Sequence, residues 1–283
     1  MSEVLNIYDH DRDSAGLTYV YPVISRRAGG VSVGINLNTN NACNWRCIYC
    51  QVPDLKRGSA PEVDLEKLAG ELRGFLHELL HGDFMQRRVP EGARRLNDIA
   101  LSGNGEPTSA KDFDRVVGSI GEIMAEFDLV GKIKLVLITN GSLVSRPKVK
   151  QGLRQMARLG GEVWFKLDSA TSSGLRRING TRQTVQKMRD NLCASALLCP
   201  TWVQTCVFAL DGNHPADVER EAYLNFIGRM RAEDVPLGGV LLYGLARPSM
   251  QPEAARLSAL PKEWMSNFAA EIESLGVTVK LNA

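Results

Sequence analysis

Hydrophobic and polar residues alternate along this chain with two different periods. Between residues 31 and 37 apolar side chains take every second position, which is typical of a strand. Between residues 64 and 81 leucine and phenylalanine recur every three or four positions, which indicates a helix with one buried face. The two patterns then follow one another, predicting strands at 98–101, 132–138, 162–167, 201–210, 239–243 and 277–281, and helices at 109–127, 147–159, 181–197, 217–230 and 261–275.

Strict alternation of strands and helices predicts a parallel sheet covered by helices. Six such units are too few for a closed eight-stranded barrel, so we expect an α/β fold that forms a partial (β/α)6 TIM-like barrel. A doubly wound open sheet is the alternative. Residues 1–28 are polar and weakly patterned, and we expect a short N-terminal extension there and one core domain over 29–283. In either architecture, sites form at the C-terminal ends of the strands.

Composition narrows the functional classes. A hydrophobic content of 44% and a charged content of 23% are ordinary for a globular protein, and a net charge of +2 argues against a generally basic nucleic-acid binder. Neither a basic-then-apolar leader nor a run of eighteen apolar residues is visible, so we expect no membrane association. Six cysteines, three of them crowded together, are typical of a reducing compartment, and we expect a cytoplasmic protein.

The three crowded cysteines follow the first predicted strand. Cys43, Cys47 and Cys50 lie within eight residues, a density of thiols that suits zinc or an iron–sulfur cluster. Three ligands are one fewer than a closed zinc site or a standard cluster takes, so a fourth ligand comes from elsewhere or one position stays open. The turn 102–107 follows the second strand, and its glycines and Glu106 carboxylate suit close approach to an ammonium group. The same residues also suit a plain strand–helix turn.

These two motifs resemble the radical S-adenosylmethionine (SAM) superfamily. Its signature is the spacing found here, three residues from Cys43 to Cys47 and two from Cys47 to Cys50, with aromatic Tyr49 before the last cysteine. The resemblance implies that the three thiolates hold a [4Fe–4S] cluster whose open iron binds SAM. It also implies that the methionine ammonium is held by the turn Gly103, Asn104, Gly105 and Glu106.

The implied activity is reductive cleavage of SAM to a 5′-deoxyadenosyl radical, which abstracts hydrogen from a substrate. The electron comes from an external one-electron reductant of the flavodoxin or ferredoxin type. Further residues at strand ends are expected to contact the ribose, carboxylate, adenine or substrate: Tyr49, Asn140, Lys166, Asp168, Gln204, Leu241 and Arg247. For Arg247 a structural ion pair is the alternative.

Five further segments are similar to the wyosine-synthase-related group of Fe–S oxidoreductases: 25–27, 105–108, 139–143, 167–170 and 176–179. Members related to the tRNA-wybutosine enzymes act on a methylated guanosine in tRNA. Here no cysteine precedes Cys43, and Lys166 stands where that branch tends to have serine. The substrate is therefore left open among tRNA, a protein activated by glycyl-radical formation, and a small molecule or peptide.

Three other patterns in the sequence have a structural and a functional interpretation. Cys193, Cys199 and Cys206 are interpreted as buried thiols, with an auxiliary cluster as the alternative. The segment 77–81 matches the zinc-protease pattern of two histidines flanking a glutamate, but it continues the polar face of its helix. Scattered basic doublets are interpreted as solvated surface, with a tRNA footprint as the alternative. A non-catalytic iron–sulfur electron-transfer protein is the rival from another class, and the Glu106 turn argues against it.

Overall fold

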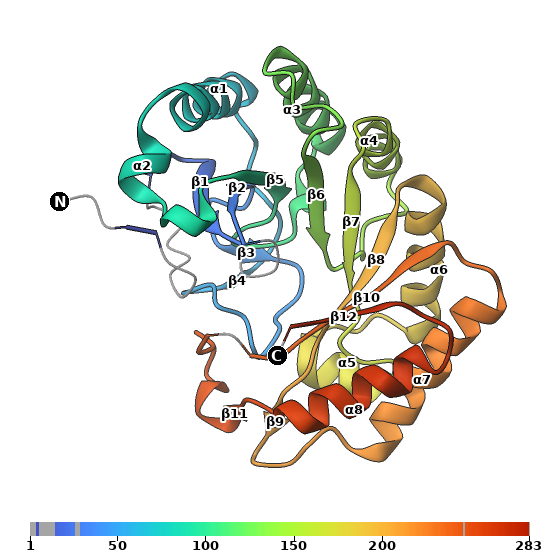
Figure 1. The fold of residues 1–283 in the computed structure, drawn as a ribbon. Helices are drawn as coiled ribbons and strands as arrows, with labels where there is room; N and C mark the ends of the chain where they lie inside the picture. The colour runs from blue at the N-terminus through green and yellow to red at the C-terminus, as the bar shows by residue number, and fades with distance from the viewer. Residues whose placement is uncertain (1–3, 6–14, 26–28, 246, 283) are drawn as a thin grey trace.

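The computed structural model describes residues 4–5, 15–25, 29–245 and 247–282 (Figure 1). Its centre is an eight-stranded sheet in the order β1-β2-β5-β6-β7-β8-β10-β12. β1 pairs antiparallel with β2, and every other neighbouring pair is parallel. The strand bounds are Val20–Ile24 (β1), Val31–Ile35 (β2), Leu96–Leu101 (β5), Lys134–Thr139 (β6), Glu162–Lys166 (β7), Thr201–Cys206 (β8), Leu237–Tyr243 (β10) and Val279–Asn282 (β12).

Helices connect the parallel strands and lie along the outer side of the curved sheet (Figure 1). The six long ones are Leu65–His81 (α1), Phe113–Glu126 (α3), Pro147–Arg158 (α4), Val185–Leu198 (α6), Asp217–Ala232 (α7) and Lys262–Glu273 (α8). Two shorter helices are Phe84–Arg88 (α2) and Ser172–Asn179 (α5). Short strands and 3-10 turns complete the fold: Ala42–Cys43 (β3), Lys56–Arg57 (β4), Ala209–Leu210 (β9), Leu257–Ser258 (β11), Glu91–Ala93 (η1), Pro107–Ser109 (η2) and Ala254–Arg256 (η3).

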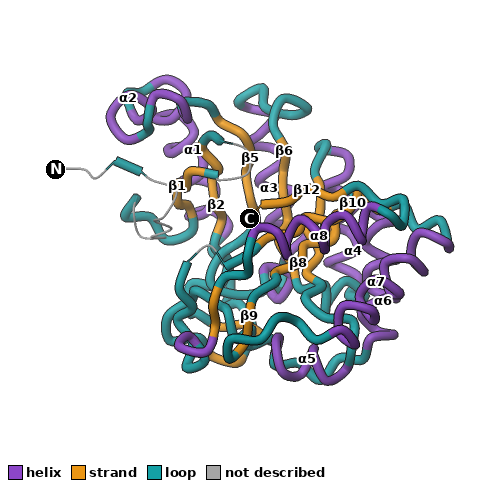
Figure 2. Tube along the Cα trace, turned by 60° about the horizontal axis from the view of Figure 1, so that its bottom comes forward, coloured by secondary structure: helices purple, strands orange, loops and turns teal. Residues whose placement is uncertain are grey.

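The parallel strands lie side by side in the order in which they occur along the chain. A doubly wound sheet would reverse this order at a switch point, so that alternative is wrong. Within the described residues β1 and β12 at the two edges do not pair, and the barrel is therefore partial. The predicted six strand–helix units and partial barrel are confirmed. Figure 2 shows the connecting loops gathered beyond one end of the strands, around β9 and beside α5.

Helix α1 shows how the apolar pattern specifies this architecture. The Asp64 side chain accepts a hydrogen bond from the Lys67 backbone N–H and caps the helix. Leu68, Leu72 and Leu76 recur every four residues and are fully buried, so one face of the helix packs on the core. No helix of the described residues is long and apolar enough to cross a membrane.

Some elements differ from the predictions. The sheet begins inside the segment expected as an extension, because β1 there pairs with β2 and buries Val20 and Ile24. The strand predicted to continue to residue 210 is interrupted after Cys206, and α2 and α5 were not predicted. The pair Arg26-Arg27 of the family-like segment 25–27 lies outside the described residues.

Candidate active site

The cysteine loop, residues 43–50, lies beyond the C-terminal end of β2 and packs against the end of α5. Cys43 belongs to β3, which pairs with β4. The Arg46 N–H donates to the carbonyl of Asn179 at 3.0 Å, and the Ile48 N–H to that of Ile178 at 2.9 Å. These backbone bonds fix the loop on a helix that is remote from it in sequence.

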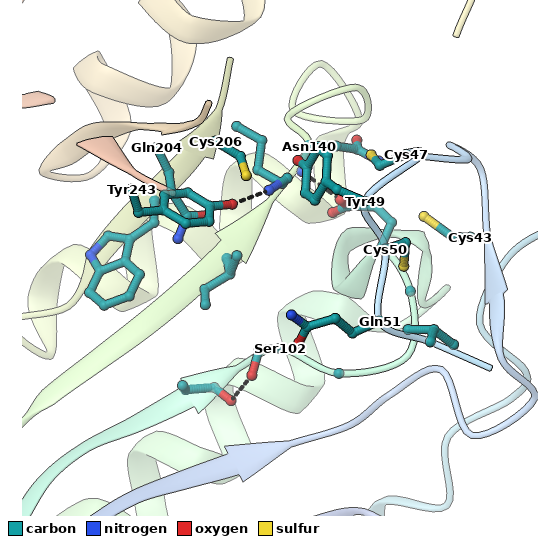
Figure 3. Close-up of a pocket in the computed structure, with 18 of the residues that line it drawn as sticks. Cys43, Cys47, Tyr49, Cys50, Gln51, Ser102, Asn140, Gln204, Cys206 and Tyr243 are labelled. Atoms are coloured by element: carbon teal, nitrogen blue, oxygen red, sulfur yellow. Dashed lines mark hydrogen bonds between the residues drawn. The ribbon is translucent and has the colours of Figure 1, made fainter. Parts of the chain in front are cut away.

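The three thiols and the Glu106 turn face one cavity of about 360 Å³. The strands β5, β6, β7, β8 and β10 supply the opposite wall, and Figure 3 shows Gln204, Cys206 and Tyr243 facing the loop from there. The predicted residues that line the cavity are Cys43, Cys47, Tyr49, Cys50, Gly103, Gly105, Glu106, Asn140, Lys166, Gln204 and Arg247. Asn104, Asp168 and Leu241 do not line it.

Glu106 is the carboxylate of the turn, and its side chain is only 2% exposed. Oε1 accepts hydrogen bonds from the Thr108 N–H and from the hydroxyls of Thr108 and Thr139, while Oε2 accepts one from the Asn140 N–H at 2.7 Å. Burial raises the pKa of Glu106, and these hydrogen bonds oppose the rise. The carboxylate is thus held rigidly at the cavity wall, where a cationic ligand group would stabilise its charge.

The glycines of this turn are required by close packing. A Cβ on Gly105 would lie 2.1 Å from the carbonyl oxygen of Ala42, directly before Cys43. Gly103 has a φ of +146° and packs on Asn36, whose Oδ1 accepts from the Asn104 N–H at 3.0 Å. The side chain of Asn104 turns to Asn41 instead of the cavity, which explains why an asparagine is accommodated there.

Asn140 connects the Glu106 turn to the cysteine loop. Besides its backbone bond to Glu106, its Nδ2 donates to Asn44 Oδ1 at 2.8 Å. Asn44 Nδ2 in turn donates to Ser142 Oγ at 2.7 Å. The two motifs therefore share one polar network through the end of β6.

Lys166 brings a positive charge into the cavity. Its Nζ donates to the Tyr243 hydroxyl at 3.0 Å and lies 5.0 Å from the centroid of the Tyr49 ring, a cation–π distance. Burial, the largest single effect, lowers the pKa of Lys166, but the charges of Tyr243, Asp168, Cys47 and Cys206 together raise it above its ordinary value. Lys166 is therefore an ammonium able to bind an anionic group.

Asp168 was expected to contact SAM or the substrate, but its carboxylate is hydrogen-bonded to other protein groups. Its Oδ2 accepts from the Tyr49 hydroxyl at 2.5 Å and from Asn179 Nδ2 at 2.6 Å, and its Oδ1 accepts from the Cys206 N–H at 2.9 Å. The carboxylate thus anchors the tyrosine that precedes the last cysteine. Arg247 lies at the cavity edge, where its Nη1 donates to Gln51 Oε1 at 3.4 Å.

Several site residues were not predicted. Tyr243 and Ser102 line the cavity from strand ends, a position that was a usable signal in the sequence. Cys206 also lines it, whereas Cys199 precedes β8 and lies at its other end, roughly 20 Å away at about 3.3 Å per residue. Cys193 contacts Met230 instead. The fold does not bring these three thiols together as an auxiliary cluster would require.

The donor set of the loop fits an iron–sulfur cluster. The Trp45 N–H donates to Cys43 Sγ at 3.4 Å and Asn179 Nδ2 to Cys47 Sγ at 3.3 Å, and such donors stabilise metal-bound thiolates. Burial raises the pKa of the Cys43 and Cys47 thiols to about 12, so metal binding must displace their protons. Among the described residues no group of three or more Cys, His, Asp or Glu side chains is arranged to hold a single metal ion.

The histidines of the protease-like segment lie elsewhere. His77 and His81 are exposed on α1 with ring centroids 5.3 Å apart, and neither lines the cavity. They form the solvated face that the helical pattern predicts.

Comparisons with known proteins show the family to which this chain belongs. A profile described as the Radical SAM superfamily matches residues 37–219. A UPF0026 protein of Synechocystis sp. is 26% identical over 200 residues, which cover 66% of this chain and 66% of that protein. A UPF0026 protein of Helicobacter pylori is 27% identical over 161 residues, 56% of this chain and 44% of that protein. The chain thus spans two thirds or less of these curated relatives.

Solved structures share the fold at low sequence identity. TYW1 with a lysine-pyruvate adduct bound gives a TM-score of 0.56 at 15% identity, covering 86% of this chain and 73% of that one. A radical SAM methyltransferase from Sphaerobacter thermophilus gives a TM-score of 0.52 at 15% identity, covering 93% of this chain and 68% of that one. Since the family profile matches more than half of the chain, including the cysteine loop and the Glu106 turn, the chain belongs to the radical SAM superfamily.

Proposed function

We propose that the cavity between the cysteine loop and the strand ends is where this radical SAM enzyme binds SAM, cleaves it reductively and abstracts hydrogen from a substrate. One observation carries the proposal: three thiols and the Glu106 turn, separate in sequence, face the same cavity. Members of the superfamily use a [4Fe–4S] cluster and SAM, which together supply the radical chemistry.

In this proposal Cys43, Cys47 and Cys50 hold the cluster. The Glu106 carboxylate binds the methionine ammonium, and its four hydrogen-bond donors keep it oriented before the ligand arrives. Lys166 binds an anionic group of SAM or of the substrate, because it is the ammonium that faces the cavity between two tyrosine rings. The strand residues, Gln204 among them, exclude water and orient the substrate.

The test is anaerobic reconstitution with iron and sulfide, reduction with dithionite, addition of SAM, and assay of 5′-deoxyadenosine. We expect formation of 5′-deoxyadenosine and a change in the EPR signal of the cluster on adding SAM. Cys47→Ala should lose both, whereas Cys199→Ala, a buried cysteine outside the cavity, should keep both. A wild-type protein that binds iron but neither cleaves SAM nor changes its signal would instead be an electron-transfer protein.

The substrate class follows from the same assay. A small molecule or peptide, a protein activated as a glycyl radical, and a tRNA are the three classes to compare. The yield of 5′-deoxyadenosine should rise above the basal level with the pool that contains the substrate. A rise with tRNA would identify a tRNA-modifying enzyme of the wyosine type.

For the reductant we propose an acidic one-electron carrier that docks over the cysteine loop. Four exposed cations lie on or next to the two segments that contact the loop: Lys56 and Arg57 on β4, Arg176 in the last turn of α5, and Arg182 just after that helix. Arg57 donates to the carbonyl oxygens of Asn44 and Gly180 and so lies directly on the loop. A positive face beside the cluster suits steered association with a negative partner.

The reductant proposal predicts that salt slows reduction by flavodoxin or ferredoxin much more than reduction by dithionite, a small anion that makes no docking interface. Lys56→Glu with Arg176→Glu should slow carrier-driven reduction roughly tenfold or more. Lys132→Glu is the matched control and should have no effect, because this exposed lysine lies in the loop between α3 and β6, before the N-terminal end of the strand. Loss of tRNA binding in place of slower reduction would assign the same face to nucleic acid.

A further inference from the structure

We propose that Asn179 is a positioning residue that raises the reduction potential of the cluster through an N–H···S hydrogen bond to Cys47. The inference rests on the proposed role of the cysteine loop as cluster ligand. Asn179 ends α5, its side chain is completely buried, and its Nδ2 lies 3.3 Å from Cys47 Sγ.

The orientation of the Asn179 amide is determined by its neighbours. The same Nδ2 donates to Asp168 Oδ2 at 2.6 Å, and a carboxylate can only accept. Asp168 is itself fixed, because it accepts from the Tyr49 hydroxyl and the Cys206 N–H. With one amide proton directed to Asp168, the other is available to the sulfur of Cys47.

The donor is positioned by the fold as well as by its side chain. The Asn179 carbonyl accepts from the N–H of Arg46, the residue before Cys47, so the backbone and the side chain of Asn179 contact two successive residues of the cysteine loop. Gly180 follows in the left-handed conformation and ends the helix there. The distance from amide to sulfur is therefore fixed by the junction between α5 and the loop.

A hydrogen bond to a cysteine ligand withdraws negative charge from the cluster and stabilises its reduced form. The Trp45 N–H does the same at Cys43, but as a backbone group it cannot be removed by substitution. Asn179 is a side-chain donor to a ligand sulfur, so its contribution is open to mutation.

The test measures the midpoint potential of the reconstituted cluster by redox-poised EPR, without SAM. Asn179→Leu removes the donor at similar volume and should disfavour reduction about tenfold, a shift of about 59 mV to more negative potential for a one-electron couple. Asn179→Ser, whose hydroxyl is too short to span the distance, should shift in the same direction and serves if the leucine variant does not fold.

The matched control is Asn191→Leu. Asn191 is also buried, but its Nδ2 donates to the carbonyl of Gly141 at 2.9 Å. The midpoint potential of the cluster in Asn191→Leu should equal that of the wild type.

An unchanged potential in an iron-loaded Asn179 variant would overturn the inference. Loss of iron from both Asn179 variants, with Asn191→Leu loaded, would also overturn it and assign Asn179 to cluster assembly. If the wild-type protein itself takes up no cysteine-dependent iron, the proposed function fails instead, so the two failures are distinguishable.

Discussion

At the scale of single residues, Glu106 shows burial and hydrogen bonding acting in opposite directions. Desolvation penalises its carboxylate, while four donors stabilise it. Burial has the larger effect, so the pKa of Glu106 lies above its ordinary value, and a cationic ligand group would stabilise the ionised carboxylate. A pKa raised by burial is expected at a site that binds a charged ligand group.

Comparison with a Glu106→Gln variant should reveal the burial penalty on the Glu106 carboxylate as a pH dependence of the unfolding free energy. The pKa of Glu106 is raised in the folded state, so the folded protein binds its proton more tightly than the unfolded chain does. The stability from this group is present below the ordinary pKa of 4.5 and is lost as pH rises through the raised pKa. Because glutamine does not titrate, the unfolding free energy of the wild type relative to Glu106→Gln should fall with rising pH.

Urea unfolding of the two proteins from about pH 4 to 8 measures this difference. Thr108→Val, which removes one donor and keeps the carboxylate, should retain the wild-type direction of the pH dependence. A difference between wild type and Glu106→Gln that stays constant across the range would contradict the raised pKa.

At the scale of elements, the end of α5 determines where the cysteine loop lies. Gly180 has φ 57° and ψ 30°, and an added Cβ would meet the Arg46 carbonyl oxygen at 2.8 Å. The obstacle is backbone of the loop itself and cannot rotate away. Helix and loop therefore tolerate no side chain at their junction.

We expect Gly180→Ala to lower both the unfolding free energy and the iron content of the protein. The left-handed conformation alone costs an alanine about 1 kcal/mol. Gly160→Ala is the matched control, because Gly160 has φ 71° and no atom within 4 Å of the added Cβ. Denaturant unfolding and iron analysis should show the conformational cost in both variants and iron loss only in Gly180→Ala. Equal iron content in the two would refute the steric argument.

At the scale of the whole molecule, the segment after β10 returns across the cysteine loop and fastens it. The Met250 N–H donates to the Cys50 carbonyl at 2.9 Å, Ser249 Oγ to that of Ile48 at 2.7 Å, and Gln251 Nε2 to that of Val52 at 2.9 Å. Arg46 and Glu253 add a two-pronged ion pair with both contacts at 3.0 Å. The C-terminal part of the barrel thus immobilises the cysteine loop, which belongs to the N-terminal part.

Gln251→Ala should therefore loosen the loop without altering the thiols. The Val52 carbonyl would lose its buried partner, at a cost of about 1–3 kcal/mol. Anaerobic release of iron to a chelator should accelerate roughly tenfold, since about 1.4 kcal/mol corresponds to that factor. Met250→Ala changes an exposed side chain in the same segment and keeps the backbone bond, so its release rate should match the wild type. Equal rates in Gln251→Ala and Met250→Ala would exclude this fastening role.

The sequence by itself determined the order of strands and helices and the two motifs that face the cavity, and it favoured the partial barrel over a doubly wound sheet. Each of these depends on neighbours in the chain: the period of apolar residues, the spacing of Cys43, Cys47 and Cys50, and the glycines beside Glu106. Because parallel strands align their C-terminal ends, position at a strand end also identified Asn140 and Lys166 as facing the same cavity.

Only the tertiary structure decided which other side chains contact the cysteine loop or line its cavity. β1 joined the sheet by pairing with β2, Asp168 turned toward Tyr49, and Cys206 lined the cavity while Cys199 lay at the opposite end of β8. The contact of Asn179 with Cys47 joins residues 132 positions apart, and that of Gln251 with Val52 joins residues 199 apart. Periodicity reports which face of an element is buried, whereas the partner across such a separation is fixed only when the elements pack.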